Sequence, residues 1–351
     1  MRSQVGGVAT HVNQLLSSSL VTDYAFEHFA IGSQGHVEST YRKLWRLAAG
    51  PFRLLLCLSR HRTQIVHVNT SLNDRAYWRD LIFLGVAKAL GIRVVYQKHG
   101  GPLPQRFFGR SLLRALTFRI ALMIPDVVVV LSREELQAYR SILPGQQVVL
   151  IPNAVDASEL VTRQLDQQYE GELRIAYIGR LVEQKGVFVA LEAIAAALSD
   201  GCKLRMTFVG EGPDESRLID RVRSLGLQTR VHFTGPLFGS AKDQFWQKVD
   251  VFLFVTMWKE GLPYSLLEAM AAGAVPITTR EGAIPDVISD GVNGLFVRAN
   301  AVDEVARAVA RLEGDRALLT KLARAARDRV TSDYNIERMA MAFDGVYRSL
   351  V

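Results

Sequence analysis

Residues 252–279 read FLFVTMWKEGLPYSLLEAMAAGAVPITT, and this stretch decides the fold. The apolar run Val251–Val255 predicts a buried strand, and Val275–Thr278 predicts a second one. Between them, Pro263 is typical of a first helical turn, and the residues after Leu266 leave almost no polar face, which predicts a buried helix. Two buried strands joined by a buried helix indicate a parallel α/β sheet.

Two carboxylates bracket the start of this helix. Glu260 lies three residues before Pro263, and Glu268 lies inside the helix, about 7–8 Å along the axis from the proline at roughly 1.5 Å per residue. A helix N-terminus attracts anions, and a buried glutamate is rare without a partner. The pattern therefore predicts an anion site; the alternative is one surface glutamate and one core glutamate paired with an arginine.

Composition sets the broad class. A length of 351 residues favours two domains, and 49% hydrophobic with 22% charged residues is ordinary for a globular protein. No apolar run reaches the roughly 18 residues needed to span a bilayer, and the first residues lack the apolar segment of a signal peptide. Cys57 and Cys202 lie far apart in apolar surroundings, so we interpret them as core residues of a reducing, cytoplasmic compartment.

Charge is divided unevenly between the two halves. Residues 1–150 hold 18 Lys/Arg and 8 Asp/Glu, whereas the remainder holds 24 and 27. A basic first half suggests an anionic partner: nucleic acid, a membrane surface or a phosphorylated acceptor. Segments 41–62 and 106–119 mix arginines with aromatic and aliphatic residues, which suits a membrane-surface helix. The alternative is a solvated amphipathic helix packed on the sheet.

Strand patterns alternate with helical patterns in two series. In the first half the expected strands are 26–31, 65–69, 93–98, 126–131 and 148–151. After a polar linker at 156–171, the expected strands are 174–178, 205–209, 231–234, 251–255 and 275–278, followed by short pieces at 284–288 and 294–297. We predict helices between them, with the helix at 41–62 broken near Gly50-Pro51. Two such series predict two Rossmann-like domains with parallel sheets facing across a cleft, with ligands at the carboxyl ends of the strands.

The N-terminus departs from this pattern. Gly6-Gly7 predicts a glycine turn that opens a helix, but only Met1–Val5 precede it, which is too short and polar for a buried strand. We therefore expect the first strand to be missing or truncated. Either the true start lies upstream of Met1, which we favour, or the domain lacks a central strand.

Fixed cations and glycines follow the strands of the second half. Arg180, in Gly-Arg-Leu, and Lys185, before a glycine, come directly after strand 174–178, where they suit a diphosphate. Gly210 closes strand 205–209 and allows close backbone approach to a ligand. Solvated loop cations and a plain turn are the alternatives. Because no Asp-x-Asp triplet or His/Cys group with ligand spacing occurs, we expect no metal; two cations and a helix dipole take its place.

These motifs resemble the retaining GT-B glycosyltransferases of family 4, also called glycosyl transferases group 1. The resemblance covers most of the chain. It rests on Gly-Arg-Leu…Lys-Gly, on Val-Gly-Glu-Gly, and on Glu-Gly-Leu-Pro…Leu-Leu-Glu-Ala-Met with seven residues between the glutamates. Gly6-Gly7 matches the family's glycine loop, and His99 matches its inter-domain histidine. Residues 152–156 match its hinge motif, and residues 286–294 match the turn after the donor site.

The resemblance implies an enzyme of the hexosyltransferase type that uses a nucleotide diphosphate sugar as donor substrate and no cofactor. Arg180 and Lys185 would neutralise the diphosphate and stabilise the leaving group. Glu268 would accept hydrogen bonds from the ribose hydroxyls, and Glu260 would hold the transferred sugar. His99 would contact the donor sugar or the acceptor. Backbone groups at the remaining expected binding positions would contact the donor: Gly7, Gly210, Gly261 and Leu262.

The resemblance also implies a domain plan. We expect an acceptor-binding domain at 1–155, a linker at 156–171, a nucleotide-sugar domain at 172–334, and a helix at 335–351 that packs back on the first domain. Asn335 stands where the family commonly has an aromatic residue. Asn69 and Ser132 are further cleft candidates, or simple polar strand ends.

The expected function is retaining transfer of a sugar to a lipid-linked or polysaccharide acceptor in cell-surface glycan biosynthesis, including lipopolysaccharide, in the cytoplasm or on the inner face of the plasma membrane. The alternative is a nucleotide-sugar-binding or assembly protein without turnover. A dehydrogenase is disfavoured because no Gly-x-Gly-x-x-Gly follows a strand. A nucleic-acid binder would explain the charge but not the glutamate pair, so no nucleic-acid partner is expected.

Overall fold

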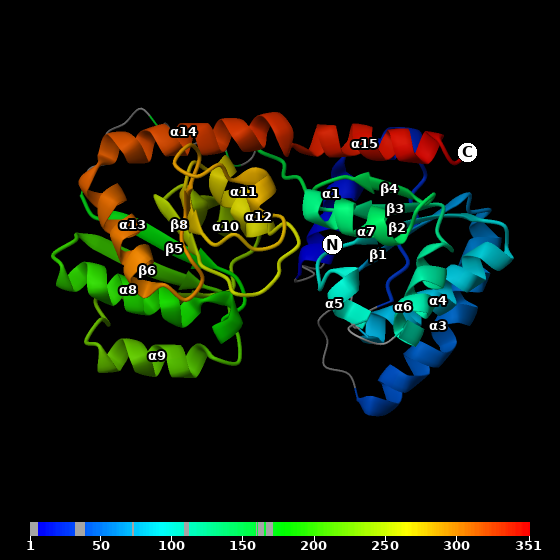
Figure 1. The fold of residues 1–351 in the computed structure, drawn as a ribbon, viewed down its shortest axis with the longest axis horizontal. Helices are drawn as coiled ribbons and strands as arrows, with labels where there is room; N and C mark the ends of the chain where they lie inside the picture. The colour runs from blue at the N-terminus through cyan, green and yellow to red at the C-terminus, as the bar shows by residue number, and fades with distance from the viewer. Residues whose placement is uncertain are drawn as a thin grey trace. The chain divides into compact units, whose positions relative to one another are not determined.

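The computed structural model describes residues 6–31, 39–71, 74–108, 112–158, 160, 165 and 171–351. The chain forms two compact units: Met1–Asn153 with Ile336–Val351, and Ala154–Asn335. The last helix therefore belongs to the same unit as the first (Figure 1).

The first unit is built on a four-stranded parallel sheet in the order β1-β2-β3-β4. The strands are β1 (Ile65–Thr70), β2 (Arg93–Lys98), β3 (Val127–Val130) and β4 (Gln147–Leu150). All four residues of β3 are valines and all are buried. A strand that is apolar on both sides is expected where helices cover both faces of a parallel sheet.

Helices cover both faces of this sheet. On one face, buried side chains of the even-numbered positions of β2 and β3 pack with α3 (Thr40–His61), α4 (Asp74–Ala89), α6 (Leu112–Leu122) and α7 (Arg133–Ile142). The other face carries α1 (Gly7–Ser17) and α15 (Ile336–Arg348), which contact each other. The short helices are α2 (Leu20–Asp23) and α5 (Pro104–Phe108).

Two expectations for this unit are wrong. Residues 26–31 form no strand; Phe29 and Ile31 instead pack against the core as irregular chain. Helix α3 runs through Pro51 without a break. The residue before a proline is normally forced out of the helical region by its Cβ, and Gly50 has none. The prediction of a missing first strand falls on residues 1–5, outside the described part of the chain.

The second unit contains a six-stranded parallel sheet in the order β10-β9-β8-β5-β6-β7. Its strands are β5 (Leu173–Ile178), β6 (Leu204–Val209), β7 (Val231–Gly235), β8 (Val251–Phe254), β9 (Val275–Thr278) and β10 (Leu295–Phe296). The chain proceeds outward from β5 to β7, then returns to the other side of β5 at β8. The boundary between β5 and β8 is thus a topological switch point, where α/β sheets bind ligands at the carboxyl ends of their strands. The prediction of two Rossmann-like parallel units is confirmed.

The helices of the second unit divide between the faces of its sheet (Figure 1). Helices α8 (Val187–Ser199) and α9 (Glu215–Ser224) contact each other, and α13 (Val302–Gly314) packs on α8. On the opposite face, α11 (Tyr264–Ala271) packs on α14 (Arg316–Asp333). The remaining elements are α10 (Gly239–Trp246), α12 (Ile284–Val287) and the short 3₁₀ turn η1 (Glu183–Lys185).

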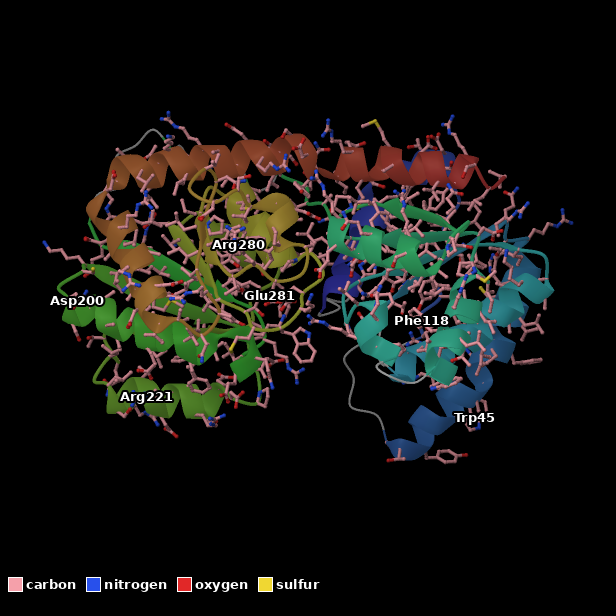
Figure 2. All side chains as sticks on the ribbon, viewed as in Figure 1. Trp45, Phe118, Asp200, Arg221, Arg280 and Glu281 are labelled. Carbon is pink, nitrogen blue, oxygen red and sulfur yellow. The ribbon has the colours of Figure 1, made fainter. Side chains whose placement is uncertain are left out.

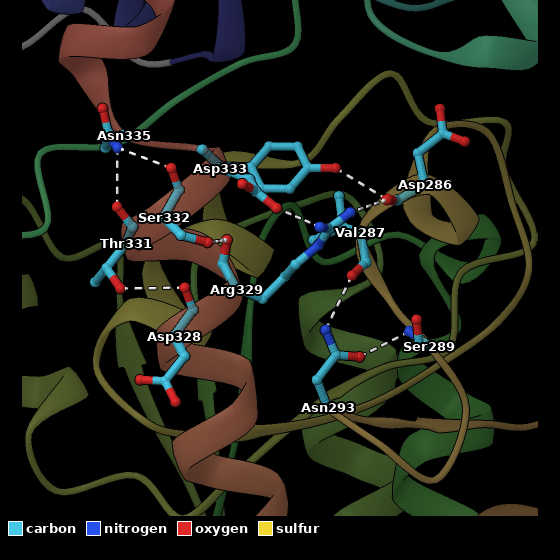
Figure 3. A network of polar contacts seen from close by, with 11 residues as sticks. Asp286, Val287, Ser289, Asn293, Asp328, Arg329, Thr331, Ser332, Asp333 and Asn335 are labelled. Atoms are coloured by element: carbon cyan, nitrogen blue, oxygen red, sulfur yellow. Dashed lines mark hydrogen bonds and ion pairs between the residues drawn. The ribbon is translucent and has the colours of Figure 1, made fainter.

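A polar network anchors the turn at 286–294 (Figure 3). The carbonyl oxygen of Asp286 accepts hydrogen bonds from Arg329 (3.2 Å) and from the hydroxyl of Tyr334 (2.9 Å) at the end of α14. Within the turn, Asn293 donates to the carbonyl of Val287 at 3.0 Å and accepts from the backbone N–H of Ser289 at 2.7 Å. These bonds fix the segment after β9 to α14. The aromatic residue here is Tyr334, one position before Asn335.

Candidate functional site

Three loops meet at the carboxyl ends of β5, β6 and β8. The backbone amide of Leu181 donates to the carbonyl oxygen of Glu211 at 2.9 Å, and that of Met257 donates to the carbonyl oxygen of Gln184 at 2.9 Å, so the β5 loop is bonded to both neighbours. A Cβ on Gly186 would lie 2.1 Å from the Val255 carbonyl oxygen, and one on Gly210 would lie 2.0 Å from the Gly179 carbonyl oxygen. These glycines are therefore required by close approach between loops.

Lys185 and Glu260 form an ion pair across this edge. The two residues come from different loops, 75 positions apart in the chain. The hydroxyl of Thr256 donates to the same carboxylate at 3.3 Å, and the Lys185 ammonium lies 5.6 Å from the centre of the Phe254 ring. An ammonium carries three N–H donors, so Lys185 can bind Glu260 and an anionic ligand together.

Arg180 lies on the same loop, and its backbone carbonyl is held by a hydrogen bond. The buried hydroxyl of Tyr177 donates to the Arg180 carbonyl at 2.9 Å. Burial, followed by the negative charge of Glu260, raises the pKa of Tyr177 far above its usual range, which keeps the phenol a donor. The Arg180 side chain is exposed and forms no ion pair with any described residue. Such an exposed guanidinium can bind a phosphate bidentately.

Glu268 is buried inside α11 and is held by two residues that the sequence did not single out. Lys242 donates to its Oε1 at 2.7 Å, and the indole N–H of Trp246 donates to its Oε2 at 3.3 Å. Burial, followed by the charge of Glu268, raises the pKa of Tyr264 well above its usual range. The alternative of a core glutamate paired with an arginine is therefore wrong; the cation is a lysine from α10.

The helix that follows Glu260 begins one residue later than expected. Helix α11 starts at Tyr264, and Pro263 is its N-cap with extended backbone (φ −67°, ψ 127°). Gly261 and Leu262 immediately precede this cap. Gly282 packs closely against the backbone of Glu260, because a Cβ there would lie 1.8 Å from the Glu260 carbonyl oxygen. That glycine has no motif around it that would have identified it from the sequence.

The close approach at Gly186 gives a testable prediction. Its φ is +78°, and alanine there meets the Val255 carbonyl, whereas Gly201 (φ +90°) has open space around a Cβ. We expect Gly201→Ala to lower the free energy of unfolding by about 1–3 kcal/mol through backbone strain alone. Gly186→Ala should cost at least about 1 kcal/mol more, since the β8 loop must also move. Urea unfolding measures both. Equal losses would contradict the proposed packing of these loops.

In the first unit, His99 follows β2 and contacts a neighbouring strand end. Its Nε2 lies 2.8 Å from Asn69 Oδ1, so Asn69 and His99, both expected at strand ends, are in contact. His99 Nδ1 is buried and has no hydrogen-bond partner among the described residues. Because Nε2–H donates to the amide oxygen, Nδ1 carries the lone pair and can accept from a hydroxyl.

His99 belongs to a group of three neighbouring histidines that the sequence did not reveal. Its ring centre lies 4.5 Å from that of His11 on α1. His67 on β1 bonds the Tyr347 hydroxyl (2.8 Å) and Gln97 Oε1 (3.0 Å). Burial lowers the pKa of His67 to about 4, and burial together with the charge of His67 lowers the pKa of His99 to about 3. Burial also lowers the pKa of His11 well below its usual value.

These lowered pKa values predict acid sensitivity of the first unit. The unfolded chain binds the protons near pH 6.5, whereas the folded chain binds them only near pH 4 and 3. The stabilisation is therefore full above pH 6.5 and is lost as the pH falls toward 4. From about pH 7.5 to 5.5, His67 and His99 should each cost about 1.4 kcal/mol. Hydrogen exchange of β1 and β2 measures this loss. Equal protection at both pH values would contradict neutral, buried histidines.

Other predicted positions have different settings. Ser132 is the N-cap of α7 and accepts from the Glu135 amide at 3.1 Å, so its role is structural. Gly7 is the first residue of α1, and a Cβ there would meet nothing within 4 Å. Among the described residues, Glu27, Cys57 and His61 bring one possible ligand atom each within 4.8 Å of the others. That no metal takes part stays a prediction. The fold joins residues 30 positions apart, which sequence spacing could not show.

Models of two glycosyltransferase families match the two halves of the chain. The description "Glycosyltransferase Family 4" matches residues 20–159, and "Glycosyl transferases group 1" matches residues 162–329. The chain is 30% identical over 233 residues to an exopolysaccharide phosphotransferase of Streptomyces coelicolor, covering 58% of this chain and 24% of that protein. It is 29% identical over 169 residues to a putative colanic acid biosynthesis glycosyltransferase of Salmonella typhimurium, covering 46% of this chain and 42% of that protein. The chain thus spans less than half the length of these relatives.

Two solved structures share the fold. Sucrose-phosphate synthase from Thermosynechococcus elongatus superposes with a TM-score of 0.76 at 19% identity, covering 99% of this chain and 94% of that one. Anabaena HepE in complex with UDP-glucose superposes with a TM-score of 0.70 at 17% identity, covering 87% and 84%.

Proposed function

Because the chain belongs to the glycosyl transferases group 1 family, we propose that it transfers a sugar from a nucleotide diphosphate sugar to a lipid-linked or polysaccharide acceptor, with retention of configuration. The observation that carries this proposal is the joined edge of β5, β6 and β8, where Lys185 and Glu260 meet. The names of the relatives, in exopolysaccharide and colanic acid synthesis, support a glycan acceptor. The UDP-glucose complex of a protein with the same fold supports the donor class.

The chemistry follows from the charges at this edge. Breaking the bond between the sugar C1 and the diphosphate oxygen leaves negative charge on the phosphate, which Arg180 and Lys185 are placed to stabilise. The acceptor oxygen forms its bond to C1 on the same face, and its proton passes to the leaving phosphate. This route requires no general base from the protein. Glu260 holds the sugar, and Glu268 holds the ribose.

A thermal-shift screen tests the donor class. UDP, GDP and ADP sugars are added separately at about 100 times their dissociation constants, where a specific ligand stabilises by about 2.7 kcal/mol. We expect one base to raise the unfolding temperature clearly above the others. Stabilisation by none of them would overturn the proposal. A bound donor without release of nucleoside diphosphate in the presence of cell-envelope glycan would favour the alternative, a binding protein without turnover.

We further propose that the first unit attaches to an anionic membrane surface through α3. Its exposed side chains Tyr41, Trp45, Phe52 and Leu56 are spaced i, i+4, i+11 and i+15, which places them in one stripe along the helix (Figure 2 labels Trp45). Their exposed fractions run from 55% to 74%. Within the described residues, no helix is both long and apolar enough to cross a bilayer.

Cations flank this stripe at helical spacing. Arg46, Arg53 and Arg60 repeat every seven residues, and Arg53 is further fixed 5.8 Å over the Phe29 ring. Helix α6, on the same face of the sheet, adds a second exposed apolar row: Leu116, Ile120 and Met123. Apolar rows bordered by arginines are typical of helices that lie in the interface of an anionic bilayer.

Vesicle binding tests the membrane proposal. We expect the protein to sediment with phosphatidylglycerol vesicles at low salt, and less with phosphatidylcholine vesicles. Arg53→Gln/Arg60→Gln should weaken binding about 30-fold, at roughly 1 kcal/mol for each charge. Arg221→Gln/Arg223→Gln, on the surface of α9 in the other unit, serves as the matched control. Unchanged binding of the α3 variant would refute this part of the proposal.

A further inference from the structure

Helix α10 orients Glu268 through both of its carboxylate oxygens. Lys242 and Trp246 are four residues apart on this helix, so their side chains leave from one face. One donates to each carboxylate oxygen, at 2.7 Å and 3.3 Å. Trp246 is fully buried and packs edge-on against Phe252, with ring centres 5.5 Å apart, which fixes the direction of its N–H.

The Glu268 carboxylate keeps free acceptor positions for a ligand. Each oxygen of an ionised carboxylate has two acceptor positions. The contacts from α10 use one on each oxygen, which leaves one on each for a ligand. Two adjacent hydroxyls, as in the cis-diol of a ribose, fit a carboxylate with one free position on each oxygen. The cation of Lys242 also matters, since a buried carboxylate is stable as an anion only when paired.

We propose that Lys242 and Trp246 are positioning residues that make this site selective for ribonucleotides over their deoxy counterparts. Lys242 holds the Glu268 carboxylate as an anion, and Trp246 fixes its rotation, so that both remaining acceptor positions face the two ribose hydroxyls. This inference rests on the proposed function, because it assumes that a nucleoside diphosphate binds at this edge.

The test compares ligands with and without the diol. Calorimetry measures binding of UDP, GDP and ADP, and of their 2′,3′-dideoxy counterparts, to the whole chain. For the base that binds, wild type should bind the dideoxy form about 30-fold more weakly, as expected for lost hydrogen bonds to a charged group. In Lys242→Met and in Trp246→Phe, this difference should shrink to about threefold, mainly through weaker binding of the ribonucleotide.

Matched variants separate positioning from general damage. Lys242→Arg keeps the charge and should restore most of the ribose preference, and Lys248→Met, at an exposed lysine just after α10, should leave it unchanged. Lys242 is partly exposed, so Lys242→Met remains informative where Trp246→Phe fails to fold. A full ribose preference in folded Lys242→Met would overturn the inference alone. Failure of every nucleoside diphosphate to bind wild type would overturn the proposed function together with it.

Discussion

Glu260→Gln is expected to lower kcat for sugar transfer by about 100- to 1000-fold, the usual loss when one preorganised charge is removed from a transition state. The carboxylate pairs with Lys185 and accepts from Thr256, so the amide would also release the lysine from its position. The donor KM should change less than tenfold, because the proposed contacts of Arg180 with the diphosphate and of Glu268 with the ribose remain. Steady-state release of nucleoside diphosphate measures both constants.

Glu192→Gln is the matched control for this prediction. Glu192 lies on α8 in the same unit and forms only a surface ion pair with Arg221. It should leave kcat within about twofold, because surface pairs contribute little. A kcat for Glu260→Gln within threefold of wild type would remove Glu260 from the transfer step.

Lys98→Met is expected to lower the free energy of unfolding of the first unit by about 3–5 kcal/mol, because it leaves a buried carboxylate unpaired. Lys98 is 1% exposed and lies 2.9 Å from Glu135, whose other oxygen accepts from the Leu131 amide at 2.9 Å. The same ammonium donates to the Pro102 carbonyl at 3.0 Å, so it also orders the loop that begins at His99. Urea unfolding followed by hydrogen exchange assigns the loss to this unit.

Two further variants sharpen that result. Arg223→Met breaks a pair whose side chains are 65% and 71% exposed, and should cost under about 1 kcal/mol. Lys98→Met/Glu135→Gln removes both charges and should recover part of the loss. A cost for Lys98→Met as small as that for Arg223→Met would show that the buried pair does not stabilise the unit.

The sequence predicts most of the fold because its strands are short apolar runs with clear ends. The bounds expected for β2 and β9 match those observed, since both lie inside a sheet that needs apolar residues on both faces. The errors come from local rules that tertiary structure overrides. Residues 26–31 have a strand-like composition but no neighbouring strand, and Pro51 is tolerated in α3 after Gly50.

The site is predictable only where it lies in contiguous motifs. Lys185 and Glu260 stand out because each belongs to a glycine-bearing loop after a strand, and the fold brings them together. Lys242 lies 26 positions before Glu268 in an ordinary amphipathic helix, so nothing in its surroundings identifies it as a partner. Pairings across helices depend on packing angles that residue patterns do not encode.

We propose above that the edge of β5, β6 and β8 binds a diphosphate. The decisive measurement is to titrate the protein with a nucleoside diphosphate and with the matching monophosphate. We expect the diphosphate to bind at least about tenfold more tightly, since a charge-assisted contact to the second phosphate is worth about 1.5–3 kcal/mol. Arg180→Met/Lys185→Met should abolish that preference while the monophosphate still binds. Equal affinities for the two nucleotides in wild type, or an unchanged preference in the double variant, would contradict a diphosphate site at this edge.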